Sequence, residues 1–342
     1  MTEIYSWQQA LWQQLSRKDR LRGHAVLLHG RAGTGKYDFA RHWAKSWLCA
    51  SPDAAQNACG ACSSCSWFEQ NAHPNFYPVM PDALSVEAES ETGKDADDDK
   101  PAKKAASQQI GIAQIRKLDD FVYLSGHQQS GKIVMIYPAD AMNMASANAL
   151  LKKLEEPPAD VLFIVVAHQL QRLPPTIRSR CQHVAMPVPD RAVAVAWLKQ
   201  QSVSDPEIVL AAAGYAPLTA LKLAQGESAQ QFAQFVQQIA RPERLNVLSL
   251  ASSLQQTSLP VVVGWLQKWC YDLIGYRTAG KVRYCLNDVP AIEALSGQLN
   301  LIECTRFVRL LNEKQRLAQH PLNPRLFLED MLIAYAEMAR KR

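Results

Sequence analysis

The stretch Gly30-Arg-Ala-Gly-Thr-Gly-Lys36 decides the fold of this chain. It fits the pattern G-x-x-x-x-G-K and lies between an apolar run at 24–29 and a helical pattern at 36–48. In that context successive backbone N–H groups can point at phosphate oxygens, and the helix N-terminus adds partial positive charge. We predict a phosphate-binding loop; the alternative is a glycine-rich turn that only caps a helix. The candidate phosphate-binding residues are Gly30, Gly33, Gly35 and Lys36.

Two departures from the usual pattern speak against ATP hydrolysis by this chain. A working loop has Ser or Thr after the lysine to hold Mg²⁺, whereas this chain has Tyr37. The strand that should end in metal-binding and water-positioning acids ends in Ile136-Tyr137-Pro138, and Asp140 comes three residues too late. Both losses affect the same chemical step, so we expect no hydrolysis. ATP or ADP binding without turnover stays open, because the backbone amides and Lys36 remain.

Three more apolar runs predict the other strands of a sheet. They lie at 132–137, 161–166 and 183–186, and helical patterns separate them. Continuous apolar strands that alternate with helices indicate a parallel sheet covered on both faces. The predicted fold class of this half of the chain is therefore α/β, with the glycine-rich loop after the first strand.

The second half of the chain carries only helical patterns, which leads us to predict three domains. These are a nucleotide-binding-like domain at 1–188, a small helical lid domain at 189–228 and an all-helical domain at 229–342. The segment 82–109 has eight acids, four bases and few apolar side chains, so we expect a flexible acidic insertion there.

Four of the eight cysteines lie within the segment 49–65 and suggest a metal site. Four thiolates on a short loop can form a tetrahedral sulfur shell around Zn²⁺. An iron–sulfur centre, a redox pair and plain buried thiols are the alternatives. Iron–sulfur motifs usually continue with a further cysteine and a proline, but Ser66-Trp67 follow here. We predict a structural zinc ion with no open position for water, held by Cys49, Cys59, Cys62 and Cys65.

Composition narrows the class of protein. The chain starts without a basic and then apolar leader, and no apolar run reaches the ~18 residues of a membrane span. We therefore expect a cytoplasmic protein, in which thiols stay reduced. The net charge is +5, and the part outside 82–109 carries +9, which is compatible with a nucleic-acid partner.

Three stretches in order carry a family resemblance. They are Gly30–Lys36, Ala147-Asn-Ala-Leu-Leu-Lys-Lys-Leu-Glu-Glu-Pro-Pro158 and Leu173-Pro-Pro-Thr-Ile-Arg-Ser-Arg-Cys181. Together they resemble the AAA+ subunits of bacterial clamp loaders, over a match that runs to about residue 225. The segment 320–330 is similar to the family's collar domain.

The resemblance implies an AAA+ P-loop domain with a zinc module in the same place, a helical lid and a helical collar. It also implies a non-hydrolysing subunit of a DNA polymerase III holoenzyme. The partners it implies are gamma/tau-type ATPase subunits and a delta-type subunit. Through the complex, the chain would act on the sliding clamp and primed DNA.

In the family, the arginine of the Ser-Arg-Cys run faces the neighbouring subunit's nucleotide. The resemblance therefore gives Arg180 the role of an arginine finger in trans, and Arg178 is its nearest competitor. An arginine is always charged and presents a planar fork of donors that suits a phosphoryl group. A lone arginine is otherwise most often an ordinary surface residue.

Two rival functions belong to other classes. The first is a self-sufficient AAA+ ATPase, against which Tyr37 and Tyr137 speak. The second is a zinc-dependent nucleic-acid-binding protein on an old nucleotide fold, which strong salt-dependent DNA binding by the isolated chain would favour. Lys152 and Lys153 are candidate exposed bases for DNA contact, although a solvated helix face explains them equally well.

Overall fold

The computed structural model describes residues 4–16, 21, 23–85, 107–123, 131–157, 160–226, 228–318, 320 and 322–340. The chain divides into two compact units, Met1–Val193 and Ala194–Arg342. Most of the acidic insertion predicted at 82–109 lies outside the described residues, and the division into three domains stays a prediction.

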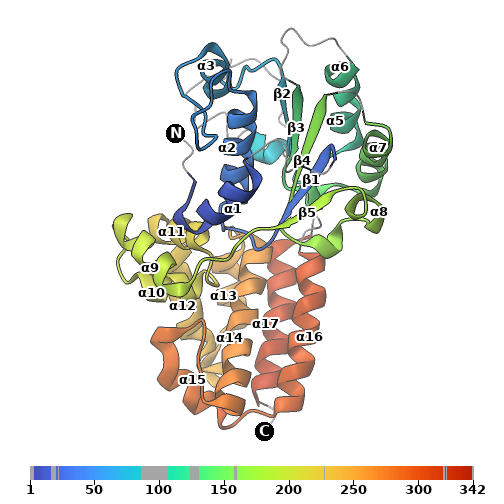
Figure 1. The fold of residues 1–342 in the computed structure, drawn as a ribbon. Coiled ribbons are helices and arrows are strands. Elements are labelled where there is room, and N and C mark those ends of the chain that lie inside the picture. The colour runs from blue at the N-terminus through green and yellow to red at the C-terminus, as the bar shows by residue number, and fades with distance from the viewer. Residues whose placement is uncertain are drawn as a thin grey trace, which may run out of the picture. The chain divides into compact units, whose positions relative to one another are not determined.

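The first unit is built on a five-stranded sheet, in which every pairing of neighbouring strands is parallel (Figure 1). The strand order is β2-β3-β4-β1-β5. All seven residues of β4 are buried, as expected for a strand inside a parallel sheet. The strands are β1 (Ala25–His29), β2 (Phe76–Val79), β3 (Lys132–Ile136), β4 (Val161–Ala167) and β5 (Gln182–Ala185).

Strand β2 was missing from the prediction. It is only four residues long and contains Pro78, which cannot donate a backbone hydrogen bond. A proline is tolerated because β2 is an edge strand that pairs with β3 alone. The other four strands lie within two residues of the predicted apolar runs.

Helices cover both faces of the sheet, as alternation along β1 requires (Figure 1). Val26 and Leu28 pack with α2 (Lys36–Leu48) on one face. Ala25 and Leu27 belong to the other face, where they share a core with α5, α6 and α7. The remaining helices of the unit are η1 (Ser6–Gln8), α1 (Gln9–Leu15), α3 (Ser63–Glu69), α5 (Ile112–Arg116), α6 (Leu118–Tyr123), η3 (Ala139–Ala141), α7 (Met144–Glu155), η4 (Leu170–Arg172), α8 (Pro175–Arg178) and the first residues of α9 (Arg191–Gln200).

The described residues of the second unit form helices joined by turns and loops, with no strand among them. The helical pattern at 206–224 taken alone predicts a single helix, but the chain turns by 108° between α10 (Pro206–Ala212) and α11 (Pro217–Gln225). Gly214 and Tyr215 both have positive φ at this turn, which an α-helix cannot accommodate. The helices that follow α9 are α10 (Pro206–Ala212), α11 (Pro217–Gln225), α12 (Ser228–Ile239), η5 (Pro242–Arg244), α13 (Val247–Leu254), α14 (Leu259–Ala279), η6 (Leu286–Asp288), α15 (Val289–Ser296), α16 (Leu301–Leu317) and α17 (Pro324–Arg340).

No single helix among the described residues is both long and apolar enough to cross a bilayer. The bent pair α10 and α11 meets the length and composition criteria only when its two helices are taken together.

A buried carboxylate fixes the loop between α14 and α15. Asp272 lies in α14 and is completely buried. Its oxygens accept the backbone N–H groups of Arg283 (2.8 Å), Tyr284 (2.8 Å) and Cys285 (2.7 Å). The Tyr215 hydroxyl donates to the Arg283 carbonyl at 2.8 Å, so the same loop also holds the turn before α11. One carboxylate therefore organises three consecutive amides.

Replacing Asp272 by alanine should leave these three amides without an acceptor. An unsatisfied buried donor costs about 1–3 kcal/mol, and one of the three bonds is buried while two are only partly buried. We therefore expect Asp272→Ala to lower the free energy of unfolding by about 3–5 kcal/mol. Asp272→Asn keeps one acceptor oxygen, so its free energy of unfolding should lie between those of the unsubstituted chain and Asp272→Ala. Urea denaturation followed by far-UV circular dichroism measures the change. Glu313→Ala, at an exposed position of α16, is the control, and an equal effect of both substitutions would refute this role of Asp272.

Candidate functional site

The glycine-rich loop has the backbone geometry that its sequence predicts. Gly30, Gly33 and Gly35 have φ values of 148°, 74° and 84°, which side-chain-bearing residues rarely adopt. At Gly35 there is also no room for a side chain, because a Cβ atom would lie 2.4 Å from the Tyr5 ring. The loop thus brings together all four predicted residues, with Lys36 opening α2.

The lysine of the loop is engaged within the chain. Lys36 is 2% exposed, and its ammonium donates to the carbonyl of Arg31. Burial lowers the pKa of Lys36 to about 8, and the carboxylate of Asp140 acts in the opposite direction. Asp140, in the first turn of η3, is therefore close enough to act on this lysine, and it accepts the backbone N–H of His168 at 2.8 Å.

Aromatic side chains stand where a magnesium site would need oxygen ligands. The rings of Tyr37 and Tyr137 pack with centroids 4.7 Å apart, and His168 meets Tyr137 edge-on at 5.4 Å. Burial raises the pKa of Tyr137 to about 12, so its hydroxyl stays neutral near pH 7. Mg²⁺ prefers carboxylate, hydroxyl and water oxygens at close to octahedral geometry. Tyr37 and Tyr137 supply no carboxylate and no aliphatic hydroxyl for Mg²⁺, and the loss of hydrolysis stays a prediction.

Side chains of the N-terminal segment donate hydrogen bonds to the phosphate loop and to the start of α2. The amide of Gln8 is completely buried and donates to the carbonyls of Thr34 and Gly35, both at 2.9 Å. The Trp7 ring nitrogen donates to the same Thr34 carbonyl at 3.1 Å. The Tyr5 hydroxyl donates to Asp38 at 3.0 Å. These partners lie about 30 residues apart in sequence, so no local pattern reveals them.

The four predicted cysteine ligands come together in space. Their sulfur atoms all lie within 4.8 Å of one another. The Sγ atom of Cys49 lies 3.5 Å from that of Cys59 and 3.9 Å from that of Cys62, and the Cys59–Cys65 separation is 4.0 Å. A tetrahedral shell with zinc–sulfur bonds of about 2.3 Å would place neighbouring sulfurs about 3.8 Å apart. The observed spacing therefore fits one tetrahedral ion.

Backbone donors prepare part of this cluster for deprotonation. Burial acts to raise the pKa of the Cys62 thiol, but N–H groups of Cys65 and Ala50 outweigh it and lower this pKa to about 6. N–H groups of Ala61 and Cys62 lower the pKa of the exposed Cys59. Burial raises the pKa of Cys65 to about 12. Only a bound cation would make all four thiolates stable together.

A buried hydrogen-bond chain attaches the cluster to the sheet domain. Ser64, between two of the cysteines, donates to the carbonyl of Leu48 at 2.6 Å and contacts His73 Nε2 at 2.8 Å. The other ring nitrogen of His73 accepts the backbone N–H of Asn75 at 3.0 Å, just before β2. The module is thus tied to both α2 and the start of an edge strand.

Arg180 lies on the surface in a defined orientation. Its side chain is 36% exposed, and its NH2 group pairs with Glu155 at 2.7 Å. Its NH1 group donates to the carbonyl of Thr176 at 3.0 Å. The competitor Arg178 has its Nε atom buried without a hydrogen-bond partner among the described residues, so it is the less available of the two. The buried Cys181 then anchors the run at the start of β5.

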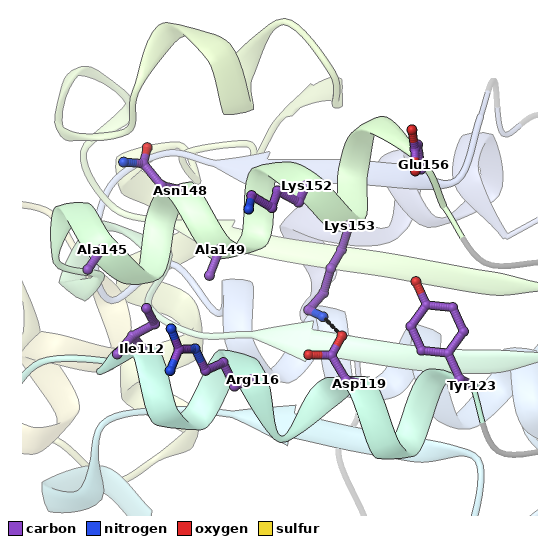
Figure 2. Close-up of a pocket in the computed structure, with 10 residues that line it drawn as sticks. All are labelled: Ile112, Arg116, Asp119, Tyr123, Ala145, Asn148, Ala149, Lys152, Lys153 and Glu156. Carbon is purple, nitrogen blue, oxygen red and sulfur yellow. Dashed lines mark hydrogen bonds and ion pairs between the residues drawn. The ribbon is translucent and has the colours of Figure 1, made fainter.

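A groove of about 490 Å³ lies between α7 and the helices α5 and α6 (Figure 2). Arg116 and Lys152 line it from opposite walls. Lys153, expected to be exposed, is only 9% exposed and forms an ion pair with Asp119, as Figure 2 shows. Lys152 is thus the more accessible of the two lysines. The remaining lining residues are Ile112, Tyr123, Ala145, Asn148, Ala149 and Glu156.

Comparison with known proteins places this geometry in a family. A family model described as "DNA polymerase III, delta subunit" matches residues 7–190. DNA polymerase III subunit delta' of Pseudomonas aeruginosa is 35% identical over 99% of this chain and 99% of its own length. The chain belongs to the DNA polymerase III delta' subunit family. The Escherichia coli member is 27% identical over 91% of this chain and 88% of its own length.

More distant relatives of the family also match. DNA polymerase III subunit gamma/tau of Mycobacterium bovis is 32% identical over 47% of this chain and 24% of its own length. Among solved structures, a gamma-subunit-related protein of Thermotoga maritima aligns over 97% of this chain and all of its own, with 18% identity and a TM-score of 0.44. The family assignment rests on the sequence matches alone.

The sulfur geometry predicts one divalent ion per chain. Cys62→Ser removes one of the four ligands and should lower the metal content to well below one ion per chain, because three thiolates hold the ion less tightly. Protons compete with the ion for the sulfurs, so affinity should fall as the pH drops from 8 through about 6, the pKa of Cys62. Elemental analysis after dialysis measures both effects. Cys181→Ser, outside the cluster, is the control, and unchanged metal content in Cys62→Ser would refute the site.

Proposed function

We propose that this chain is the delta'-type subunit of a bacterial clamp loader within the DNA polymerase III holoenzyme. It assembles with gamma/tau-type ATPase subunits and a delta-type subunit, and the complex loads the sliding clamp onto primed DNA. The full-length similarity to delta' subunits supports the assignment. The predicted lid and collar supply the helical domains of such a subunit, and reduced thiols that hold a metal fit a cytoplasmic location.

One observation carries the division of labour that we propose: Arg180 and the phosphate loop lie at opposite ends of the paired strands β1 and β5. Strand β5 pairs in parallel with β1, with Gln182 opposite Val26 and Ala185 opposite His29. The loop follows the carboxyl end of β1, whereas Arg180 precedes the amino end of β5. A rise of about 3.3 Å per residue separates the two by roughly 15 Å along the strands. Arg180 therefore serves a nucleotide outside this chain.

The exposed guanidinium suits an arginine finger in trans. Its charge is permanent, and its donors match phosphoryl oxygens in geometry. Placed at the γ-phosphate of a neighbouring subunit, it offsets the charge that develops as the bond breaks. Such fingers raise rates by about 10³–10⁵-fold, or about 4–7 kcal/mol of transition-state stabilisation. The chain thus contributes to catalysis without an active site of its own.

Arg180→Ala should leave the chain folded and able to assemble but slow ATP turnover at the adjoining site by about 10³-fold or more. Because the other ATPase sites keep their own fingers, total DNA-stimulated turnover should fall by the share of that one site. Arg180→Lys keeps the charge but loses the fork, and we expect little rescue. Steady-state ATPase of the reconstituted complex measures this, with size-exclusion chromatography as the assembly control. Unchanged turnover at the adjoining site would refute the finger.

We further propose that the four-cysteine cluster holds a structural Zn²⁺ ion. All four positions are taken by protein sulfurs, so none is left for a reacting water. The ion would supply cross-linking of the segment after α2, and Ser64 and His73 would connect that cross-link to the sheet. The phosphate loop, by contrast, we regard as a retained structural element; nucleotide binding without turnover stays a prediction.

The groove between α5 and α7 is the candidate contact for the DNA backbone. Arg116 and Lys152 line it, and cations that neutralise phosphates release condensed counterions. Arg116→Ala and Lys152→Ala should each weaken DNA binding by the complex and reduce the slope of log K against log salt by about 1. Fluorescence anisotropy with primed DNA at several salt concentrations measures the slope. Arg325→Ala, at an exposed position of α17, is the control, and an equal effect there would contradict the assignment.

A further inference from the structure

We propose that Glu155 is a positioning residue for Arg180: it holds the guanidinium in the orientation from which it reaches the neighbouring nucleotide. This inference rests on the proposed role of Arg180 as a finger in trans. It adds a second residue of this chain, 25 positions earlier in sequence, to the machinery of the adjoining site.

The guanidinium is held along two of its edges. Its NH2 group pairs with Glu155 Oε1 at 2.7 Å, and its NH1 group donates to the Thr176 carbonyl at 3.0 Å. A weaker contact joins NH1 to the Ser179 hydroxyl at 3.4 Å. A planar fork bonded on two sides has a fixed plane, and the side chain still keeps 36% of its surface exposed. The remaining N–H donors are therefore available to an outside phosphate in one defined direction.

The topology explains why Glu155 can do this. It is the last residue of α7, and that helix leads into the amino end of β4. Arg180 leads into the amino end of β5. Since the strands are parallel, both side chains lie at the amino ends of the strands, whereas the phosphate loop lies at the carboxyl ends. An acid at this place acts on the finger and not on the degenerate nucleotide site.

The local electrostatics of α7 do not favour an acid at its end. The C-terminus of a helix carries partial negative charge and is stabilised by cations, not by carboxylates. Lys152 and Lys153 in the last turn follow that preference, whereas Glu155 opposes it. The partner that compensates Glu155 is Arg180.

Stability cannot be the main effect of the pair. Both side chains are substantially exposed, 36% for Arg180 and 43% for Glu155, and exposed ion pairs contribute little to folding. The gain lies in orientation, because a freely rotating arginine must lose side-chain freedom before it binds in the transition state. An effect on orientation appears in kcat and leaves the KM for ATP nearly unchanged.

The experiment is a double-mutant cycle in the reconstituted complex, with DNA-stimulated ATP turnover at the adjoining site as the readout. Glu155→Ala should lower kcat there about two- to fivefold, the range expected for an exposed pair. Glu155→Gln keeps an acceptor oxygen and should retain more than half of the activity. In an Arg180→Ala background, Glu155→Ala should have no further effect, since it acts only through Arg180.

Thermal unfolding of the isolated chain provides the stability control. Glu155→Ala should change the melting temperature no more than Glu329→Ala, which breaks an Arg–Glu pair of 2.8 Å on α17 whose glutamate is less exposed than Glu155. A larger loss of stability would show a structural role and overturn the inference.

The kinetic outcomes separate this inference from the proposed function. If Arg180→Ala slows turnover while Glu155→Ala leaves it unchanged, or raises it, the finger stands and the positioning role is overturned. Equal losses from Glu155→Ala in the presence and absence of Arg180 overturn it as well. If Arg180→Ala itself has no effect, the finger is refuted, and the positioning role is refuted with it.

Discussion

The parallel pairing of β1 between β4 and β5 is the constraint on which the rest of this structure depends. It places two features at opposite ends of the strands: the phosphate loop follows the carboxyl end of β1, and Arg180 precedes the amino end of β5. No side-chain rearrangement can bring these two features together, because the strands themselves separate them. A domain with this topology can lose the residues for hydrolysis at the carboxyl ends of its strands and keep an exposed arginine at the amino ends.

The two ends of the strands carry different kinds of side chains. At the carboxyl end, Tyr37 and Tyr137 pack against each other at the positions where the usual motifs have metal ligands. At the amino end, Arg180 is partly exposed, and its guanidinium bonds to a carbonyl and a carboxylate. Under the proposed function, the carboxyl end no longer supports turnover, and the amino end acts on the nucleotide of a neighbour. The proposed division of labour, in which the chain assists catalysis by a neighbour, rests on this difference between the two ends of the strands.

The sequence predicted the elements whose signals are local. The bounds of α2 agree with the helical pattern at 36–48, because a glycine-rich loop precedes it and a cysteine loop follows. The clustering of the four cysteines was predictable because they lie within seventeen residues. Strand β2 was missed because Pro78 and its short length conceal it, and the turn at Gly214 was missed because alanines on both sides continue a helical pattern.

Long-range contacts could not be predicted in the same way. Nothing local in the sequence indicates that Gln8 bonds to the phosphate loop, that Asp119 neutralises Lys153, or that Glu155 meets Arg180. Each depends on which elements become neighbours in the fold, so the sequence supplied candidate residues and the structure supplied their partners.

The retained phosphate loop has a physical explanation that needs no nucleotide. Its carbonyls accept hydrogen bonds from the N-terminal segment, and its lysine is buried against the Arg31 carbonyl. Gly35 leaves the space that Tyr5 occupies. Once these contacts exist, replacing a glycine or the lysine would damage packing even where no phosphate binds. The loop therefore connects the N-terminal segment, β1 and α2 through contacts that do not depend on a bound phosphate.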